Sequence, residues 1–133
     1  MLLDGRDAIA PSLTLDAFLS SALGRGAQSC GVAVDWPWFS IGQHKVFGDA
    51  CTITLSFHKQ ALTTVSLFVL GLDDGAGGDY DVDATIALNA RFEAWLAAKL
   101  GPPPHTYPWG NVAAVYDPRS VSTAVFVAYS KRT

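Results

Sequence analysis

The chain is poor in charged residues and has no cluster of basic ones. Only 16% of its 133 residues are charged, the formal net charge is −3, and the nine lysines and arginines are scattered along the sequence. Nucleic-acid binding needs a basic patch that neutralises phosphates, so we expect no nucleic-acid partner. The acidic balance fits a partner with a basic surface, and it also fits plain solubility.

Long apolar runs are missing as well. The N-terminal stretch carries Asp4 and Asp7 and has no continuous apolar core, both of which argue against a secretory signal. Nowhere does the sequence reach the 18 or so apolar residues that a membrane-spanning helix needs. We therefore expect a cytoplasmic protein without a membrane partner.

Metal-binding and cofactor-binding spacings are also lacking. Cys30 and Cys51 form no CxxC motif, and we expect two reduced thiols. The alternation of Asp79, Asp81 and Asp83 is that of a calcium loop. The glycine and the glutamate that an EF-hand requires at its sixth and twelfth positions are nevertheless both replaced by alanine. The sequence therefore predicts neither a metal nor a cofactor.

Catalytic and phosphate-binding motifs do not occur. The sequence contains no GxSxG, HExxH or P-loop pattern, and Glu93 is its only glutamate. The glycines before the long predicted helix lie in a loop, 73–83, whose five aspartates would repel phosphate. No catalytic residue is predicted, although a His–Asp pair that forms only in space stays open.

What the sequence does contain is the pattern of one α+β domain spanning residues 1–133. Half of the residues are hydrophobic, which is enough for a full core. The clearest strand is 51–58, where Cys51, Ile53, Leu55 and Phe57 alternate with polar residues. The predicted elements, in order, are a short helix at 13–24, strands at 31–36, 50–59 and 62–72, a long helix at 84–100, and strands at 111–116 and 121–129. Between the first two strands, the aromatic segment 36–48 is expected to hold a bend or a sheet edge.

The long helix has the strongest signal. Its apolar stripe is Leu88, Phe92, Trp95, Leu96 and Leu100. Either Asp81 or Asp83 is expected to cap its start, and Gly101 followed by three prolines ends it. The predicted architecture is an antiparallel sheet of about five to six strands, with a short N-terminal helix and this long helix packed on it.

The C-terminal stretch YPWGNVAAVYDPRS is read as a β-hairpin. Pro118 fixes φ at the second turn position, and the Asp117 carboxylate accepts hydrogen bonds from the turn's own amides. Val121 stands where a glycine would ease the end of the turn. Tyr107 and Trp109 are expected to cover one end of the core.

These C-terminal motifs resemble those of a group of small bacterial proteins of unknown function. The motifs are Trp95-Leu96, Leu100-Gly101, Tyr107-Pro108-Trp109-Gly110, and Tyr116 to Ser120, with a similar Phe18-Leu19 to Leu23-Gly24 step near the N-terminus. They are caps, turns and aromatic plugs, so the resemblance implies a fold rather than an activity. By analogy of size and composition, the chain is also similar to immunity proteins for bacterial toxins.

The leading hypothesis is accordingly a non-enzymatic, protein-binding module such as a toxin-immunity protein. Its acidic loop would face a basic partner, which speeds encounter. Trp38 would add an aromatic anchor, and so would Phe68 if the long helix does not cover the face of the strand that carries it. The predicted partner-binding residues are Asp73, Asp74, Asp79, Asp81, Trp38 and Phe68. A homodimer built on sheet edges is a further hypothesis.

The alternative is a small-molecule-binding protein or an enzyme that uses a cavity between the sheet and the long helix. Phe92, Trp95 and Trp109 would line this cavity, together with strand residues. His58 or His105 would supply its polar groups.

Overall fold

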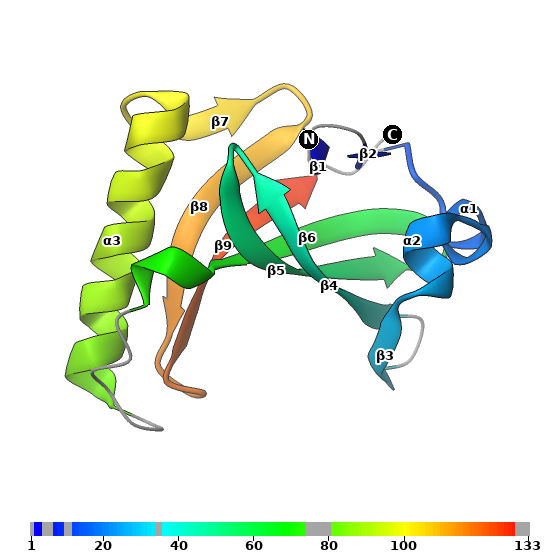
Figure 1. Cartoon of the computed structure of the whole chain (residues 1–133), viewed down its shortest axis with the longest axis horizontal. Coiled ribbons are helices and arrows are strands. Elements are labelled where there is room, and N and C mark those ends of the chain that lie inside the picture. The colour runs from blue at the N-terminus through cyan, green and yellow to red at the C-terminus, as the bar shows by residue number, and fades with distance from the viewer. Residues whose placement is uncertain (1, 4–6, 10–11, 34–35, 74–80, 130–133) are drawn as a thin grey trace.

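One antiparallel sheet organises the chain, and its seven strands follow the order β3-β4-β5-β6-β9-β8-β7 (Figure 1). The computed structural model describes residues 2–3, 7–9, 12–33, 36–73 and 81–129. The strands are β3 Gln28–Ala33, β4 Trp36–Val46, β5 Asp49–His58, β6 Ala61–Val69, β7 His105–Tyr107, β8 Gly110–Asp117 and β9 Ser122–Tyr129. The helices are α1 Leu15–Ser20, α2 Ala22–Arg25, the 3-10 helix η1 Leu70–Leu72 and α3 Val82–Leu100. A separate short pair, β1 Leu2–Leu3 and β2 Asp7–Ala8, precedes them.

The α+β architecture predicted from the sequence is confirmed, although the sheet has more strands than expected. The unexpected strand is β7, whose three residues are too few to give a periodic signal. The aromatic segment forms the whole of β4, which pairs with β3 on one side and β5 on the other, so it is not an edge. The expected bend is a register shift between Ser40 and Gly42, where Gly42 adopts a φ of 76°.

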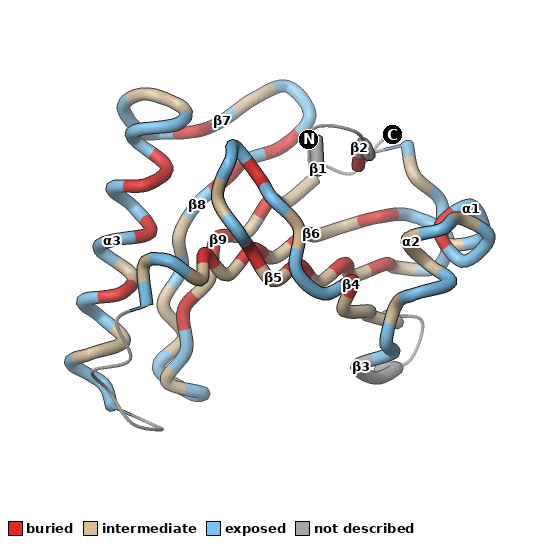
Figure 2. The backbone as a smooth tube through the Cα atoms, in the orientation of Figure 1, coloured by how far each residue is buried: buried red, intermediate tan, exposed pale blue. Residues whose placement is uncertain are grey.

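The core lies on one face of the sheet, as Figure 2 shows by its alternating buried and partly exposed strand positions. In β5, Cys51, Ile53, Leu55 and Phe57 are all buried, which confirms the predicted alternation. The α1 residue Phe18 packs on Phe57 with ring centroids 5.4 Å apart. Since α3 also contacts the odd-numbered face of β5, through Asp49, both helices cover the same face of the sheet, at its two ends in Figure 1.

The long helix α3 begins two residues before its predicted start. The Asp81 carboxylate accepts a hydrogen bond from the Ala84 amide at 3.0 Å, so Asp81, and not Asp83, is the N-cap. The four residues Leu88, Phe92, Trp95 and Leu96 are buried, as the apolar stripe predicts. Gly101 ends the helix with a φ of 87°. No helix among the described residues is long and apolar enough to cross a membrane.

The N-terminal helix is divided, which corrects the single helix expected at 13–24. Thr14 is the N-cap of α1, and its hydroxyl oxygen accepts a hydrogen bond from the Ala17 amide at 3.1 Å. At Ser21 the chain leaves the helix, and the Ser21 hydroxyl accepts from the Gly24 amide at 3.1 Å. This second cap starts α2, because a serine side chain that satisfies the amide three residues ahead nucleates a new turn.

The predicted C-terminal hairpin is present as β8 and β9. Its last register pair is Asp117 with Ser122, and the Asp117 carboxylate accepts from the Arg119 amide at 2.9 Å. This hydrogen bond is the main reason that the pKa of Asp117 lies below its usual range. Val121 completes the turn with a φ of 50°, a left-handed conformation that favours glycine.

Candidate functional site

A cavity of about 290 Å³ lies between the C-terminal half of α3 and the sheet. Five aromatic residues wall it, namely Phe47, Trp95, Tyr107, Trp109 and Tyr129. Six aliphatic residues complete the lining, namely Ile9, Leu67, Leu96, Leu100, Val112 and Val127. We call this space the aromatic cavity. Because Phe47 and Trp109 are 52% and 39% exposed, their rings mark its opening to solvent.

The YPWG stretch places three of these aromatic rings together. Tyr107 pairs with Gly110 across the β7–β8 turn, and Gly110 pairs with Tyr129 of β9. A side chain at Gly110 would collide with the carbonyl group of Ala128, so only glycine allows this close approach of β8 and β9. The Tyr107 and Trp109 rings stack with their centroids 5.0 Å apart and their planes 8° from parallel. The centroids of the Trp109 and Tyr129 rings lie 5.6 Å apart.

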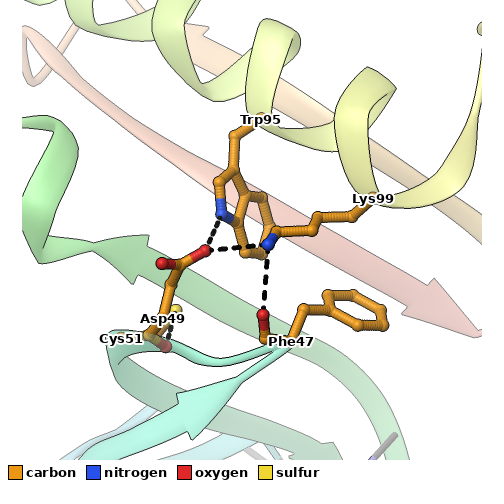
Figure 3. Close-up of polar contacts among 5 residues, drawn as sticks. All are labelled: Phe47, Asp49, Cys51, Trp95 and Lys99. Carbon is orange, nitrogen blue, oxygen red and sulfur yellow. Dashed lines mark hydrogen bonds and ion pairs between the residues drawn. The ribbon is translucent and has the colours of Figure 1, made fainter.

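On the opposite side of the cavity, Asp49 ties the β4–β5 hairpin to α3 (Figure 3). The Trp95 indole N–H donates to the Asp49 carboxylate at 2.7 Å, and the Lys99 ammonium lies 3.2 Å from the same oxygen. Lys99 also donates to the Phe47 carbonyl at 3.1 Å, which holds the turn under the helix. The hydrogen bond from Trp95 and then that from Lys99 lower the pKa of Asp49 below its ordinary value of 3.8.

Two other titratable groups nearby are shifted by burial. Burial raises the pKa of the Cys51 thiol to about 11, and the charge of Asp49 adds to this shift. Burial likewise raises the pKa of the Tyr129 phenol, which therefore stays protonated at neutral pH. A thiol with such a pKa is a poor nucleophile, so Cys51 has a packing role here.

The structure brings only part of the predicted cavity set together. Trp95 and Trp109 line the aromatic cavity, as expected. Phe92 lies on the same helix but packs against Phe68, with ring centroids 5.3 Å apart. His58 lines neither this cavity nor the neighbouring one. It lies at the end of β5, where its ring packs against Trp36 with centroids 4.1 Å apart and the ring planes tilted by 33°. His58, which was expected to supply polar groups, therefore lies away from the aromatic cavity.

His105 belongs to a neighbouring cavity of about 250 Å³ beside β7 and β8. Its Nε2 lies 2.8 Å from the Gly101 carbonyl oxygen, and since a carbonyl only accepts, Nε2 carries the proton. The side chain is 8% exposed. His105 thus fixes the end of α3 instead of facing the aromatic cavity.

The predicted partner-binding residues differ in their surroundings. Asp74 and Asp79 lie outside the described residues. Asp81 caps the long helix through its carboxylate, and both Asp73 and Asp81 are exposed. Trp38 is half-buried in β4.

Phe68 corrects the expectation of an exposed aromatic anchor. Phe68 lies in β6, and β9 pairs with β6 only as far as Leu67, which lies opposite Val125. Beyond this point the Phe68 ring makes an edge-to-face contact with the Phe92 ring, with an angle of 88° between the ring planes, and Phe68 is half-buried. The long helix therefore covers a residue that strand alternation alone assigns to the polar face.

Several residues that line the aromatic cavity were not predicted from the sequence. Ile9 and Phe47 lie far from α3 in the sequence, and only the fold brings them to its C-terminal half. A signal for Phe47 exists in the Phe-Gly pair, which forms the two-residue turn between β4 and β5 with φ values of 52° and 85°. Ile9 gives no comparable signal.

Comparisons with protein-family models, with curated proteins and with solved structures find no match for this chain. Within the described ranges, no group of three or more histidine, cysteine, aspartate or glutamate side chains is arranged to hold a metal ion. The aromatic cavity is thus the feature of the described residues with the most developed binding geometry.

Proposed function

We propose that this protein binds a small apolar molecule in the aromatic cavity. The observation that carries the proposal is a space of about 290 Å³ walled by five aromatic and six aliphatic side chains. Ligand sites are typically concave, mainly apolar, and roughly 300–1,000 Å³ in volume, so this cavity lies near the lower end of that range. Its size favours a ligand with few non-hydrogen atoms.

The walls of the cavity are held firmly, which supports a preformed site. Asp49 joins Trp95 to the β4–β5 hairpin, and Gly110 locks β8 onto β9 beneath the Tyr107–Trp109 stack. A ligand that enters such a site loses less free energy to side-chain ordering than one that must shape its own pocket.

The direct test is to titrate the protein with a set of small apolar compounds and record the four tryptophan indole N–H signals by NMR. Trp95 and Trp109 line the cavity, whereas Trp36 and Trp38 belong to β4 and do not. We expect the first two signals to shift and the other two to stay in place. Shifts at all four tryptophans, or at none, would contradict the proposal.

A matched pair of variants identifies the site. Val127→Phe fills the cavity from β9, and Trp109→Ala removes an exposed wall, so both are expected to weaken binding at least tenfold. Trp36→Ala removes an equally exposed tryptophan outside the cavity and is expected to leave binding unchanged. Trp109→Ala keeps the test valid if Val127→Phe does not fold.

A second candidate function is binding of a protein partner with a basic surface, as in toxin inhibition by an immunity protein. One observation favours it: Val82 and Ile86 are 46% and 49% exposed on the first turns of α3, beside the exposed residues Asp81 and Asp83. Exposed apolar residues next to acids suit a partner that is apolar at its centre and basic at its rim. We expect the protein to capture a basic protein, and the association rate of the two to fall as the salt concentration rises. Val82→Lys is expected to weaken this complex. An association rate independent of salt contradicts this candidate.

A further inference from the structure

The chemistry of the aromatic cavity narrows the class of its ligand, given that the proposed function is correct. A cavity of about 150 Å³ lined by apolar side chains holds benzene. The aromatic cavity, at about 290 Å³, is roughly twice that size. Two fused rings, or a chain of similar volume, therefore match it better than a single ring.

The arrangement of the walls favours a planar aromatic ligand over a flexible chain. The rings form two groups, with Tyr107, Trp109 and Tyr129 on the sheet side, and Phe47 and Trp95 at the hairpin and helix. The Phe47 and Trp95 ring centroids lie 6.0 Å apart with the ring planes tilted by 58°, and both residues line the cavity. Aromatic pairs gain stability from offset-stacked and edge-to-face contacts, which a planar ligand makes with both groups.

The charges around the cavity exclude an ionised ligand. None of the described lining residues is an aspartate, glutamate, lysine, arginine or histidine. The Asp49 carboxylate accepts from the wall residue Trp95 and pairs with Lys99, so it has no uncompensated charge to offer a cation. An unpaired charge in an apolar site costs far more free energy than a neutral polar group.

The Tyr129 hydroxyl is a polar group of the lining that can recognise a ligand. The Trp95 N–H is occupied by Asp49, but none of the residues that the structure describes hydrogen-bonds to the Tyr129 hydroxyl. Tyr129 lies at the end of β9, opposite Gly110 of β8, and burial raises the pKa of its phenol. Tyr107 also has a hydroxyl, but it lies in the edge strand β7 beside the exposed Trp109, where water can satisfy it.

We propose that the ligand is an uncharged, planar molecule with two fused aromatic rings and one hydroxyl or amine group, which hydrogen-bonds to the Tyr129 hydroxyl. The phenol can donate or accept, so either kind of group is suitable. The rings supply most of the affinity by burial, and the hydrogen bond supplies selectivity.

The experiment compares three probes of the same shape, namely naphthalene, 2-naphthol and the cation N-methylquinolinium, by calorimetric titration. The wild type is expected to bind 2-naphthol about fivefold to tenfold more tightly than naphthalene, the effect of one hydrogen bond, and the cation least. Tyr129→Phe removes only the hydroxyl and is expected to abolish the preference while retaining naphthalene binding. Tyr107→Phe is the matched control and is expected to keep the preference.

The outcomes separate this inference from the proposed function. If no probe binds, the two-ring ligand is refuted, and the titration with the set of small apolar compounds still decides the proposed function. If naphthalene binds but 2-naphthol has no advantage, or if the advantage survives Tyr129→Phe, the apolar site stands and the role of Tyr129 is refuted. Tightest binding of the cation would replace the neutral ligand with a cation held by the aromatic rings.

Discussion

Asp49 makes two polar contacts between the sheet and the long helix. It accepts from the Trp95 indole at 2.7 Å and pairs with Lys99 at 3.2 Å, although its side chain is 45% exposed. Exposed ion pairs contribute little on their own, so the bond to the buried indole carries the greater share of the stabilisation. The sequence gives no indication of this role, because 46 residues separate Asp49 from Trp95.

We expect Asp49→Asn to lower the free energy of unfolding by about 1 kcal/mol at pH 7. The amide oxygen still accepts from Trp95, but the charge that favours the Trp95 and Lys99 contacts is lost. Because these contacts lower the folded-state pKa of Asp49, its stabilisation is complete above the ordinary value of 3.8 and is lost as the pH falls through the folded pKa. Urea denaturation of both proteins at pH 7 and at about pH 2 measures the change. A difference that is equal at the two pH values would contradict this account.

Val121 is strained at the end of the β8–β9 turn. Its φ of 50° is unfavourable for a β-branched side chain, and such strain costs on the order of 1–3 kcal/mol. We expect Val121→Gly to raise the free energy of unfolding by about 1 kcal/mol, since the flexibility of glycine in the unfolded chain offsets part of the gain. Ser120→Gly, at a neighbouring turn position without positive φ, is the control and is expected to destabilise. Thermal denaturation of both variants provides the measurement, and a stabilising Ser120→Gly would show that the strain is not specific to Val121.

At the scale of elements, the start of α3 depends on one cap. Asp81 satisfies the Ala84 amide, and this hydrogen bond follows directly from an aspartate placed before a helical pattern. We expect Asp81→Ala to cost about 1 kcal/mol of unfolding free energy. Asp83→Ala, one turn position inside the helix, removes only a favourable charge near the helix dipole and is expected to cost about 0.3 kcal/mol. Equal losses in chemical denaturation would assign the effect to charge and not to capping.

The elements with strong local signals were predictable, and those shaped by their neighbours were not. The period of β5 and the apolar stripe of α3 are properties of consecutive residues, so both were predicted correctly. The break at Ser21 depends on a side-chain hydrogen bond that competes with the helix, and β7 exists only because β8 offers it a partner. Pairing and competition of this kind leave little trace in composition or periodicity.

At the scale of the whole molecule, the central strands should be the last part to unfold. β5, β6 and β9 are paired on both sides and carry the fully buried residues Ile53, Leu55, Val65 and Val125, whereas β3 and β7 are the edges of the sheet. We expect amide hydrogens in β5, β6 and β9 to exchange with rates set by global unfolding, and those in β3 and β7 to exchange at least tenfold faster through local opening. Hydrogen exchange followed by NMR or mass spectrometry measures this order. Slow exchange at β7 would instead mean that the wall of the aromatic cavity belongs to the stable core.

The sequence by itself determined the α+β class, the amphipathic long helix with its cap and stop, the alternating strand β5 and the C-terminal hairpin, because each depends on residues that are close in the chain. Only the tertiary structure decided which of those residues form a site. In the folded chain, Phe47, Tyr129 and Trp95 line the same cavity. His58 packs against Trp36, and Phe68 packs against Phe92 of the long helix, beyond the point where β6 stops pairing with β9. A cavity is bounded by side chains from distant elements, so its walls are set by the crossing of helix and sheet, which no local pattern encodes.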